Sequence, residues 1–366
     1  MNSSAIYKYK NRVFKQVPNV LFGKGSVERV AELIPSKLLD KQKIIFVDSF
    51  FQHSGDLVGK LKNKAFFENS RDLVYFFDAK LNEPHVEDID GILALIKQKG
   101  LNPEVIIGAG GGSTMDVAKA VSVMLRNLGS AADYQGWDLV ENDAVFKIGI
   151  PTIFGSGAEA SRTAVLSAKE KKQGINSDKS MFNAIIIDSN LSQTVDPQQF
   201  FHTAMDCYIH CIESLQGTMI NTLSKSYASQ ATDLCRESLL KSKDMDQLAS
   251  ASYLGGVSIV NSEVGLCHAL SYGLSVVFGY RHGIANCIAF RVLGEYYAEA
   301  VNEFEQMVKI YKIELPSNVT KSASKEQINK LIQITKMMEK PLTNALGDNW
   351  SSILTDDKIA LLYSKM

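Results

Sequence analysis

The sequence predicts a Rossmann-like α/β domain followed by an all-helical (all-α) domain. Three observations support this prediction. Short β-rich runs alternate with helical patterns up to about residue 195, Gly-rich turns follow two of these runs, and strand signals fade after Asp196-Pro197. Such an order is typical of an open parallel sheet wound with helices, followed by packed helices. We therefore expect two domains, residues 1–195 and residues 196–366.

The β-rich runs of the first half have the length and composition of buried strands. Continuous runs of Val, Ile and Phe are typical of strands covered on both faces of a parallel sheet. The stretch VEDIDGILALIKQKG (86–100) has the apolar spacing of a helix instead. The expected strands are 43–50, 73–78, 104–110, 146–153, 161–168 and 183–188, with a polar loop at 169–180 between the last two.

Long helical patterns occupy the second half of the chain. Apolar residues recur there at intervals of three and four, the spacing of an amphipathic helix. The clearest examples are residues 221–242, 246–260 and 295–312. We expect helices from residue 196 to the C-terminus.

Composition excludes several classes of protein. With 366 residues, a formal net charge of −1 and no basic stripe, the chain is long enough for two domains and is not expected to bind nucleic acid. The first residues lack a secretory signal pattern, and no apolar run is long enough to span a membrane. The odd number of cysteines, without CxxC spacing, favours reduced thiols and a cytoplasmic protein. The cysteines are Cys207, Cys211, Cys235, Cys267 and Cys287.

Four side chains in the second half are candidate metal ligands. Asp206 and His210 are four residues apart in a helical stretch, so both leave the same face. His268 lies in a second helical stretch, and His282 precedes Gly283. Three imidazoles and one carboxylate suit divalent iron or zinc. Both segments are apolar and rich in Gly and Ala, so their polar groups are costly to bury unless they have a partner.

Other interpretations of these residues remain open. An Asp and a His four apart on a helix often form a surface pair, and a single His in an apolar helix is often a hydrogen-bonded core residue. His202, four residues before Asp206, is a competing ligand of lower rank, because it lies near the start of the helix. The cysteines beside the ligands are soft donors or, more commonly, small core residues.

A glycine loop in VIIGAGGGSTMDVAKAV predicts a phosphate site in the first half. A buried strand runs into Gly110, Gly111 and Gly112, and Ser113 then begins a helix that contains Asp116. Glycines allow close approach of a phosphate, and a helix N-terminus supplies N–H groups. The loop departs from the usual dinucleotide fingerprint, which ends in Gly or Ala where this chain has Ser113, and a simple tight turn is the alternative.

Two further turns complete the expected nucleotide site. Asp48 ends the strand 43–50, and its carboxylate can reach an adenosine ribose if that strand lies beside the glycine-loop strand. Such contact would favour NAD over NADP; the alternative is that Asp48 caps the following turn. PTIFGSGAEAS, with Thr152 and Ser156, follows another strand and is expected at the same sheet edge.

The motifs GGGSTMDVAKA, IPTIFGSGAEAS, MDCYIHCIES and GLCHALSYGLSVVFGYRHGIANC resemble the iron-containing alcohol dehydrogenase family over nearly the whole chain. The resemblance implies its dehydroquinate synthase-like fold, a nicotinamide nucleotide (NAD or NADP), a divalent metal and a homodimer. It implies the following roles: metal ligation by Asp206, His210, His268 and His282, pyrophosphate contacts near Gly111, Gly112 and Ser113, nicotinamide contacts near Thr152 and Ser156, and ribose contact by Asp48.

Two departures from the family pattern concern the substrate. The family commonly has a second histidine where this chain has Tyr272, and we expect Tyr272 to orient the substrate. Arg281 stands where the family often has Pro. Arg281 and Arg162 are candidates to clamp a carboxylate, although an ion pair with a nearby acid is as good an interpretation of each.

Several segments, among them YQGWDLVEN and GINSD, most resemble the subgroup that oxidises the C8 hydroxyl of 3-deoxy-D-manno-octulosonate (Kdo). This resemblance implies an acidic sugar substrate and an aldehyde that a pyridoxal phosphate (PLP) aminotransferase then converts to the 8-amino sugar of lipopolysaccharide. The subgroup has been regarded as an oxidase, whereas the intact glycine loop favours a nicotinamide acceptor.

Our hypothesis is that the metal lowers the pKa of the substrate hydroxyl while hydride passes to the nicotinamide. The main alternative is an NAD-dependent dehydrogenase or reductase of small alcohols, aldehydes or polyols. A lyase related to 3-dehydroquinate synthase and a catalytically silent scaffold protein are weaker alternatives.

Overall fold

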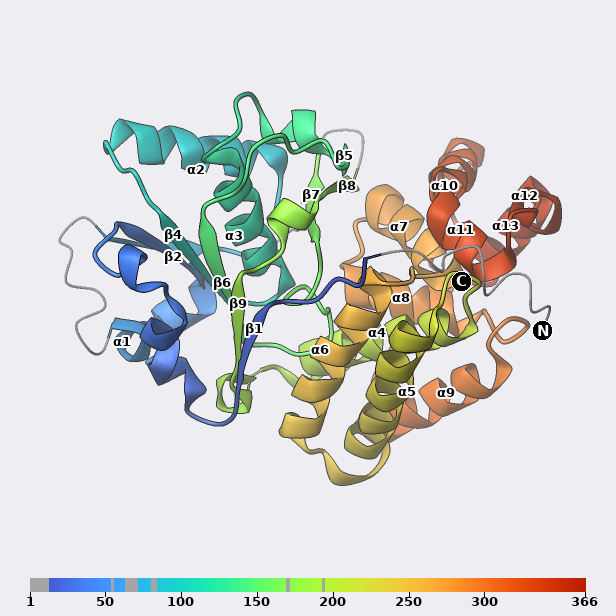
Figure 1. Cartoon of the computed structure of the whole chain (residues 1–366). Helices are drawn as coiled ribbons and strands as arrows, with labels where there is room; N and C mark the ends of the chain where they lie inside the picture. Colours follow the sequence, from blue (N-terminus) through green and yellow to red (C-terminus); the bar gives the residue numbers. More distant parts are fainter. Residues whose placement is uncertain (1–12, 54–55, 63–71, 80–83, 169–171, 193–194) are drawn as a thin grey trace. The chain divides into compact units, whose positions relative to one another are not determined.

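The computed structural model describes all residues except 1–12, 54–55, 63–71, 80–83, 169–171 and 193–194 (Figure 1). The segment expected to lack a secretory signal and the first part of the expected polar loop therefore lie outside the described residues. The chain forms two compact units. The α/β unit contains Gln16–Phe154 and Ala158–Val195, and the helical unit contains Asp196–Met366 together with Lys15 and Gly155–Gly157.

A six-stranded parallel sheet forms the centre of the α/β unit, in the order β1-β9-β6-β4-β2-β3. Every pairing recorded within this sheet is parallel, which confirms the expected parallel strands, although β3 at the sheet edge is half-buried rather than buried. The edge strand β1 was not predicted, because four residues with mostly exposed side chains carry no strong strand signal. The strands are β1 (Asn19–Phe22), β2 (Lys43–Asp48), β3 (Leu73–Phe77), β4 (Val105–Gly110), β6 (Phe146–Pro151) and β9 (Ala184–Ile187).

One face of the sheet packs against short N-terminal helices. Alternate residues of a strand point to the same face, so Ile45, Val47 and Ile107 lie together in one apolar core. This core includes residues of the 3₁₀ helix Ser26–Leu33 and of α1 (Leu57–Lys62). Burial of these side chains on both sides explains why the strands are almost continuously apolar.

Helix α3 (Gly112–Met124) covers the opposite face. Gly108 of β4 and Gly149 of β6 are register partners there. A Cβ at Gly108 would lie 2.6 Å from Cβ of Ala118 in α3, and a Cβ at Gly149 would lie 2.8 Å from the ring of Phe182. Glycine at position 108 therefore lets α3 pack close to the sheet, and glycine at position 149 leaves room for the Phe182 ring. The helix predicted for residues 86–100 is α2 (Val86–Gln98), which packs beside α3.

A second, three-stranded sheet corrects one prediction. Residues 169–180 were expected to form a polar loop, but 172–176 form strand β8, which pairs antiparallel with β7. Backbone pairing outweighs the polar composition here, because Gly174 lies close to β7 and Ile175 is buried. The strands of this sheet are β5 (Gly136–Trp137), β7 (Thr163–Ser167) and β8 (Lys172–Asn176).

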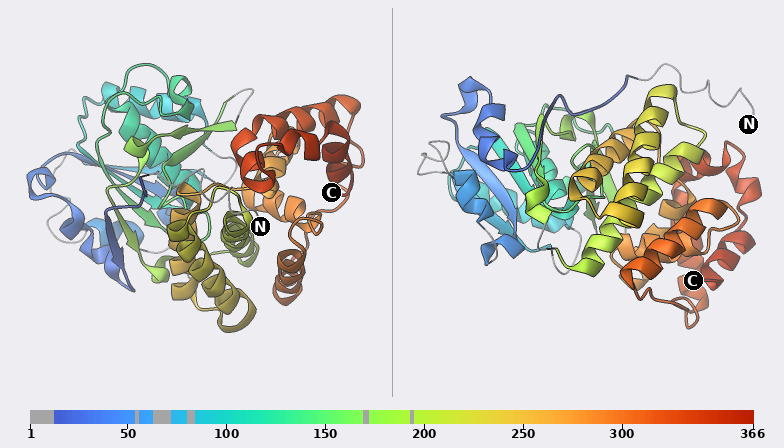
Figure 2. Two further views of the ribbon diagram at one scale, coloured as in Figure 1. Left: turned by 45° about the vertical axis from the view of Figure 1, so that its right-hand side comes forward. Right: turned by 90° about the horizontal axis from the view of Figure 1, so that it is seen from below.

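The helical unit is built around α4, which packs against α5, α6 and α8 (Figure 1). Asp196 caps the start of α4 through hydrogen bonds from the N–H groups of Gln198 and Gln199, and Pro197 occupies its first turn. Figure 2 shows the C-terminal helices, in red, gathered beside α7. The helices are α4 (Pro197–Gln216), α5 (Thr222–Glu237), α6 (Met245–Val260), α7 (Leu266–Phe278), α8 (His282–Arg291), α9 (Ala298–Tyr311), α10 (Lys325–Met337), α11 (Glu339–Leu346), α12 (Trp350–Ile353) and α13 (Asp356–Ser364).

The helices of this unit confirm the predicted helical second half. The expected helix 221–242 is α5 followed by one π-helical turn, Ser238–Ser242. None of the described helices is both long and apolar enough to cross a bilayer.

A buried lysine in the sheet makes the stability of the α/β unit dependent on pH. Lys147 of β6 is 2 % exposed, and its Nζ donates a hydrogen bond to the Lys179 carbonyl oxygen at 2.8 Å. Burial, reinforced by the nearby Lys119 ammonium and partly opposed by Asp143, lowers the pKa of Lys147 from 10.5 to about 7. Between pH 7 and pH 10.5 the unfolded chain binds more protons at Lys147 than the folded chain does. The free energy of unfolding therefore rises with pH in this range and decreases as the pH falls toward 7.

We expect Lys147→Met to flatten the rise in unfolding free energy between pH 7 and pH 10, by up to a few kcal/mol. Chemical denaturation across this range measures the effect. Lys97→Met, on the exposed side of α2, is the control and should keep the wild-type slope. An unchanged slope for Lys147→Met would show that this lysine does not carry the pH dependence.

Candidate metal centre and glycine loop

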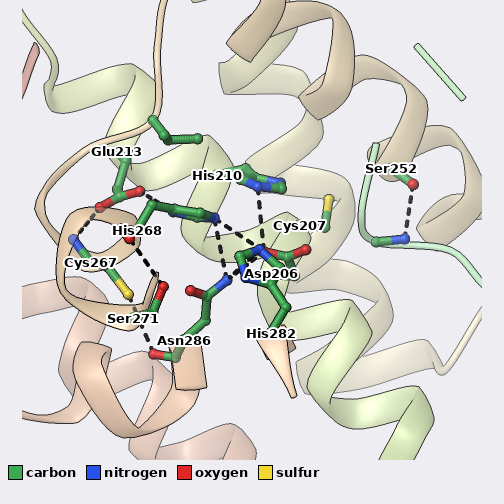
Figure 3. A network of polar contacts seen from close by, with 12 residues as sticks. Asp206, Cys207, His210, Glu213, Ser252, Cys267, His268, Ser271, His282 and Asn286 are labelled. Atoms are coloured by element: carbon green, nitrogen blue, oxygen red, sulfur yellow. Dashed lines mark hydrogen bonds and ion pairs between the residues drawn. The ribbon is translucent and has the colours of Figure 1, made fainter. Parts of the chain in front are cut away.

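Three helices bring the four predicted metal ligands together (Figure 3). Helix α4 presents Asp206 and His210 one turn apart on the same face. His268 comes from the first turn of α7, and His282 is the first residue of α8. The four donor atoms all lie within 4.8 Å of one another, although they come from three separate helices.

The donor atoms converge on one carboxylate oxygen. Oδ1 of Asp206 lies 3.3 Å from Nε2 of His210, 3.3 Å from Nε2 of His268 and 3.6 Å from Nε2 of His282. Donors that surround one ion tetrahedrally with bonds of 2.0–2.1 Å are about 3.4 Å apart, which follows from zinc–ligand geometry. The spacing therefore suits a small divalent cation, and the donor set suits iron or zinc equally well.

Burial of the site adds a second reason to expect a cation. The side chains of Asp206, His210 and His268 are at most 6 % exposed, whereas that of His282 is 27 % exposed. In the described part of the chain, the ion pairs of Asp206 are all with histidines. A buried carboxylate without a lysine or arginine needs another positive group, either a proton on an imidazole or a metal ion.

The pKa values of these side chains depend on the balance between their burial and the charges of their neighbours. Burial would raise the pKa of Asp206, but the neighbouring imidazoles of His210 and His282 outweigh it and hold the pKa below its usual range. Burial lowers the pKa of His210, so this imidazole favours its neutral form, the form that binds metals. For His268, burial is outweighed by the carboxylates of Glu213 and Asp206, which raise its pKa to about 9.

Two polar residues around the site were not predicted. Glu213 contacts Nδ1 of His268 through Oε2 at 2.5 Å. Asn286 donates from Nδ2 to Oδ1 of Asp206 at 2.7 Å and lies 3.3 Å from Nε2 of His282 (Figure 3). Their helical spacing was the available signal, since Glu213 is seven residues after Asp206 on α4 and Asn286 is four after His282 on α8.

The competing ligands lie outside this group. His202 is buried at the start of α4, is not a member of the cluster, and its Nε2 has no hydrogen-bond partner among the described residues. All five cysteines are buried and unpaired by disulfides. Cys207 and Cys235 contact each other, with their Sγ atoms 3.4 Å apart.

The glycine loop lies where the sequence placed it, between β4 and α3. Gly110 ends the strand, Gly111 precedes the helix and Gly112 begins it. Gly111 is the N-cap residue, so Ser113 is the second residue of the helix rather than its cap. Thr152 is adjacent, because its N–H donates to the Gly110 carbonyl oxygen at 3.0 Å. The N-terminus of a helix of this length, beside three glycines, can bind a phosphate.

The two acids expected near the nucleotide both have partners within the protein. Strand β2, which ends at Asp48, is the direct neighbour of β4, as the ribose interpretation requires. Asp48 also caps the following 3₁₀ helix, because its Oδ1 accepts from the Phe50 N–H at 3.0 Å. Asp116 lies in α3, accepts from the Val165 N–H at 3.1 Å and pairs with Lys119 at 3.7 Å.

Gly155–Gly157 of the second Gly-rich turn belong to the helical unit. The Gly155 N–H donates to Oγ of Ser252 at 2.8 Å, and a Cβ at Gly155 would lie 1.8 Å from the Thr203 carbonyl oxygen. Since Gly155 also has φ of 145°, only glycine fits there. Ser156 follows it and is half-buried.

The predicted substrate residues differ in their partners. Arg162 pairs with Asp138 and with Asp178, whose Oδ1 is 2.8 Å from Nε, so its charge is already balanced. Arg281 is exposed and donates to the neutral amide of Gln199 at 3.2 Å. The ring of Tyr272 lies 5.6 Å from the ring of His282, between centroids.

We expect metal-free wild-type protein to take up one equivalent of Zn²⁺, and Asp206→Ala to lose this stoichiometric binding, because the three remaining imidazoles lack the carboxylate on which they converge. A ligand present at 100 times its Kd should stabilise the wild type by about 2.7 kcal/mol. Atomic emission after dialysis and thermal unfolding measure both effects. His202→Ala should still bind the ion; equal binding by Asp206→Ala would contradict this site.

Two family models match successive parts of the chain. Residues 18–189 match the model described as iron-containing alcohol dehydrogenase, and residues 200–345 match the C-terminal model of the same family. Alcohol dehydrogenase 4 of Saccharomyces cerevisiae is 28 % identical over 290 residues, covering 74 % of this chain and 72 % of the yeast protein. The sulfoacetaldehyde reductase of Bilophila wadsworthia is 29 % identical over 293 residues, covering 77 % and 74 %.

Solved structures show the same fold. The sulfoacetaldehyde reductase of Bifidobacterium kashiwanohense, in complex with NAD⁺, superposes with a TM-score of 0.78 at 22 % identity, covering 96 % of this chain and 97 % of the other. A 1,3-propanediol oxidoreductase gives a TM-score of 0.78 at 20 % identity, covering 96 % and 99 %. The chain therefore belongs to the iron-containing alcohol dehydrogenase family and is an oxidoreductase of alcohols or aldehydes.

Proposed function

We propose that the chain oxidises a primary alcohol to an aldehyde, with hydride transfer to a nicotinamide nucleotide. The observation that carries this proposal is the convergence of Asp206, His210, His268 and His282 within 4.8 Å. Iron or zinc held there would act as a Lewis acid and lower the pKa of a bound hydroxyl. The family membership and the glycine loop support the same reaction.

The exposure of the ligands indicates how an alcohol reaches this site. His282 is the one partly exposed member of the group, so the substrate approaches from its side. Tyr272 lies beside the His282 ring and can donate or accept a hydrogen bond with a substrate hydroxyl. We assign it an orienting role rather than a proton-transfer role, because an ordinary tyrosine titrates near pH 10, which follows from its reference pKa.

The glycine loop is proposed to bind the pyrophosphate of NAD or NADP. Gly111, Gly112 and Ser113 offer backbone N–H groups at the start of α3, and Thr152 lies beside Gly110. Ser156 is assigned to the nicotinamide side by the family pattern. Asp48, at the end of the neighbouring strand, is assigned to the adenosine ribose.

We expect Asp48→Asn to weaken NAD binding and to improve the use of NADP relative to NAD, because the negative charge that repels a 2′-phosphate is removed while the helix-capping oxygen is kept. A shift of about 10-fold or more in the ratio of kcat/KM for the two nucleotides corresponds to one charged hydrogen bond. Steady-state kinetics with both nucleotides measure it. An unchanged ratio would leave Asp48 with its capping role alone.

We further propose that the substrate is anionic, specifically Kdo, and that its C8 hydroxyl is oxidised. Arg281 directly precedes the ligand His282, is exposed, and has a neutral amide as its hydrogen-bond partner in the described residues. A guanidinium in that state can bind a carboxylate bidentately. Arg162 is the weaker candidate, because two aspartates already neutralise it.

The relatives include enzymes named for anionic and for neutral compounds, such as sulfoacetaldehyde reductase and butanol dehydrogenase. A dehydrogenase or reductase of small alcohols or aldehydes is therefore the second candidate. If Kdo is the substrate, we propose that a PLP aminotransferase uses the aldehyde product. We also propose that the protein is a cytoplasmic homodimer.

We expect Arg281→Gln to raise KM for Kdo by about 10- to 100-fold, the cost of a lost charged hydrogen bond, and to leave KM for butanol, glycerol and propanediol unchanged. Absorbance of the reduced nicotinamide and oxygen uptake, followed in parallel, identify the acceptor. Arg29→Gln removes an equal charge from an exposed site in the α/β unit and should change neither KM. Activity with neutral alcohols but none with Kdo would favour the second candidate.

A further inference from the structure

Glu213 lies directly behind the metal ligand His268 (Figure 3). Its side chain is fully buried, and both carboxylate oxygens have partners. Oε2 contacts Nδ1 of His268 at 2.5 Å, and Oε1 accepts from the Cys267 N–H at 2.6 Å. Glycine at position 265 makes this approach possible, because a Cβ there would lie 3.0 Å from Oε1 of Glu213.

We propose that Glu213 is a positioning residue of the metal centre, which holds His268 with Nε2 toward the ion and supplies a second negative charge that strengthens metal binding. This inference rests on the proposed metal site. It assigns to Glu213 an action through His268, not a contact with substrate or ion.

The geometry selects one tautomer of His268. A neutral imidazole carries one N–H, and a carboxylate at Nδ1 keeps the proton on that nitrogen. Nε2 is then unprotonated and has a lone pair that can bind a metal. It is the nitrogen that lies 3.3 Å from Oδ1 of Asp206. The same contact fixes the rotation of the ring, which stacks on the His210 ring with 17° between the planes.

The charges around the site favour a carboxylate over an amide at position 213. Asp206 and Glu213 together carry two negative charges, and both are buried. With neutral imidazoles, one divalent ion balances the two carboxylates, so the loaded site has no net charge to bury. With Asp206 alone, the loaded site would keep one positive charge in an apolar surrounding.

A purely structural role for Glu213 is the competing explanation. The Cys267 N–H belongs to the first turn of α7, whose N-cap, Gly265, offers no side-chain cap. Glu213, which belongs to α4, therefore also caps the N-terminus of α7. A residue with this role alone would affect the stability of the metal-free protein and leave metal binding unchanged.

The test compares Glu213→Gln with the wild type in the full chain. Glutamine keeps the shape and one acceptor oxygen but loses the charge. We expect metal-free Glu213→Gln to bind Zn²⁺ about 10- to 100-fold more weakly in chelator competition, the usual effect of removing such a partner of a ligating histidine. The Co²⁺-loaded variant should also show shifted absorption bands, because the field of His268 changes.

Ser214→Ala is the matched control. Ser214 is the next residue of α4, is equally buried, and hydrogen-bonds with Ser258 and Ser262 away from the ligands. It should keep the wild-type Kd for Zn²⁺ and the wild-type Co²⁺ spectrum. A Glu213→Gln protein with wild-type Kd and spectrum, whatever its melting temperature, would overturn the inference. Failure of the wild type itself to bind one ion would overturn the proposed function instead.

A measurement on the wild type covers the case in which Glu213→Gln does not fold. In zinc-loaded protein labelled with ¹⁵N-histidine, His268 should carry its proton on Nδ1 and the metal on Nε2. The opposite tautomer would overturn the inference without any substitution.

Discussion

The burial of two carboxylates in the helical unit is the constraint on which the candidate site depends. Asp206 and Glu213 lie on one face of α4, and each is at most 3 % exposed. The partners recorded for them among the described residues are imidazoles, amides and backbone N–H groups rather than lysine or arginine. Such an arrangement is stable when a proton or a metal ion balances the charge, and three imidazoles aimed at one carboxylate oxygen favour the metal.

Each unit of the chain builds its site from a regular feature of its fold. In the helical unit, α4 packs against α5, α6 and α8 and also contacts α7, so its side chains meet residues from α7 and α8. In the α/β unit, the glycine loop follows a central strand of a parallel sheet, where strand ends and helix starts coincide. Glycines at positions 108 and 110 permit this packing, because a Cβ at either would approach α3 to 2.6 Å.

Sequence patterns predicted most of the fold and the four clustered ligands, because both depend on residue types at regular spacing. Asp206 and His268 stood out as polar residues in apolar helices. Glu213 was missed because its helical spacing from Asp206 indicates only a shared face of α4 and does not reveal its partner His268, which is 55 residues away. Strands 19–22 and 172–176 were missed for a related reason, since polar or exposed segments become strands through pairing with distant residues.

The uneven exposure of the four proposed ligands has a consequence for how an ion would be acquired. Asp206, His210 and His268 are enclosed by the packed helices, whereas His282 begins α8 and faces partly outward. At the proposed site an ion would therefore meet His282 first, on the partly exposed side of the cluster. For the proposed site, iron and zinc would compete for the same donors, so the ion that binds to the folded protein would depend on which of the two is supplied.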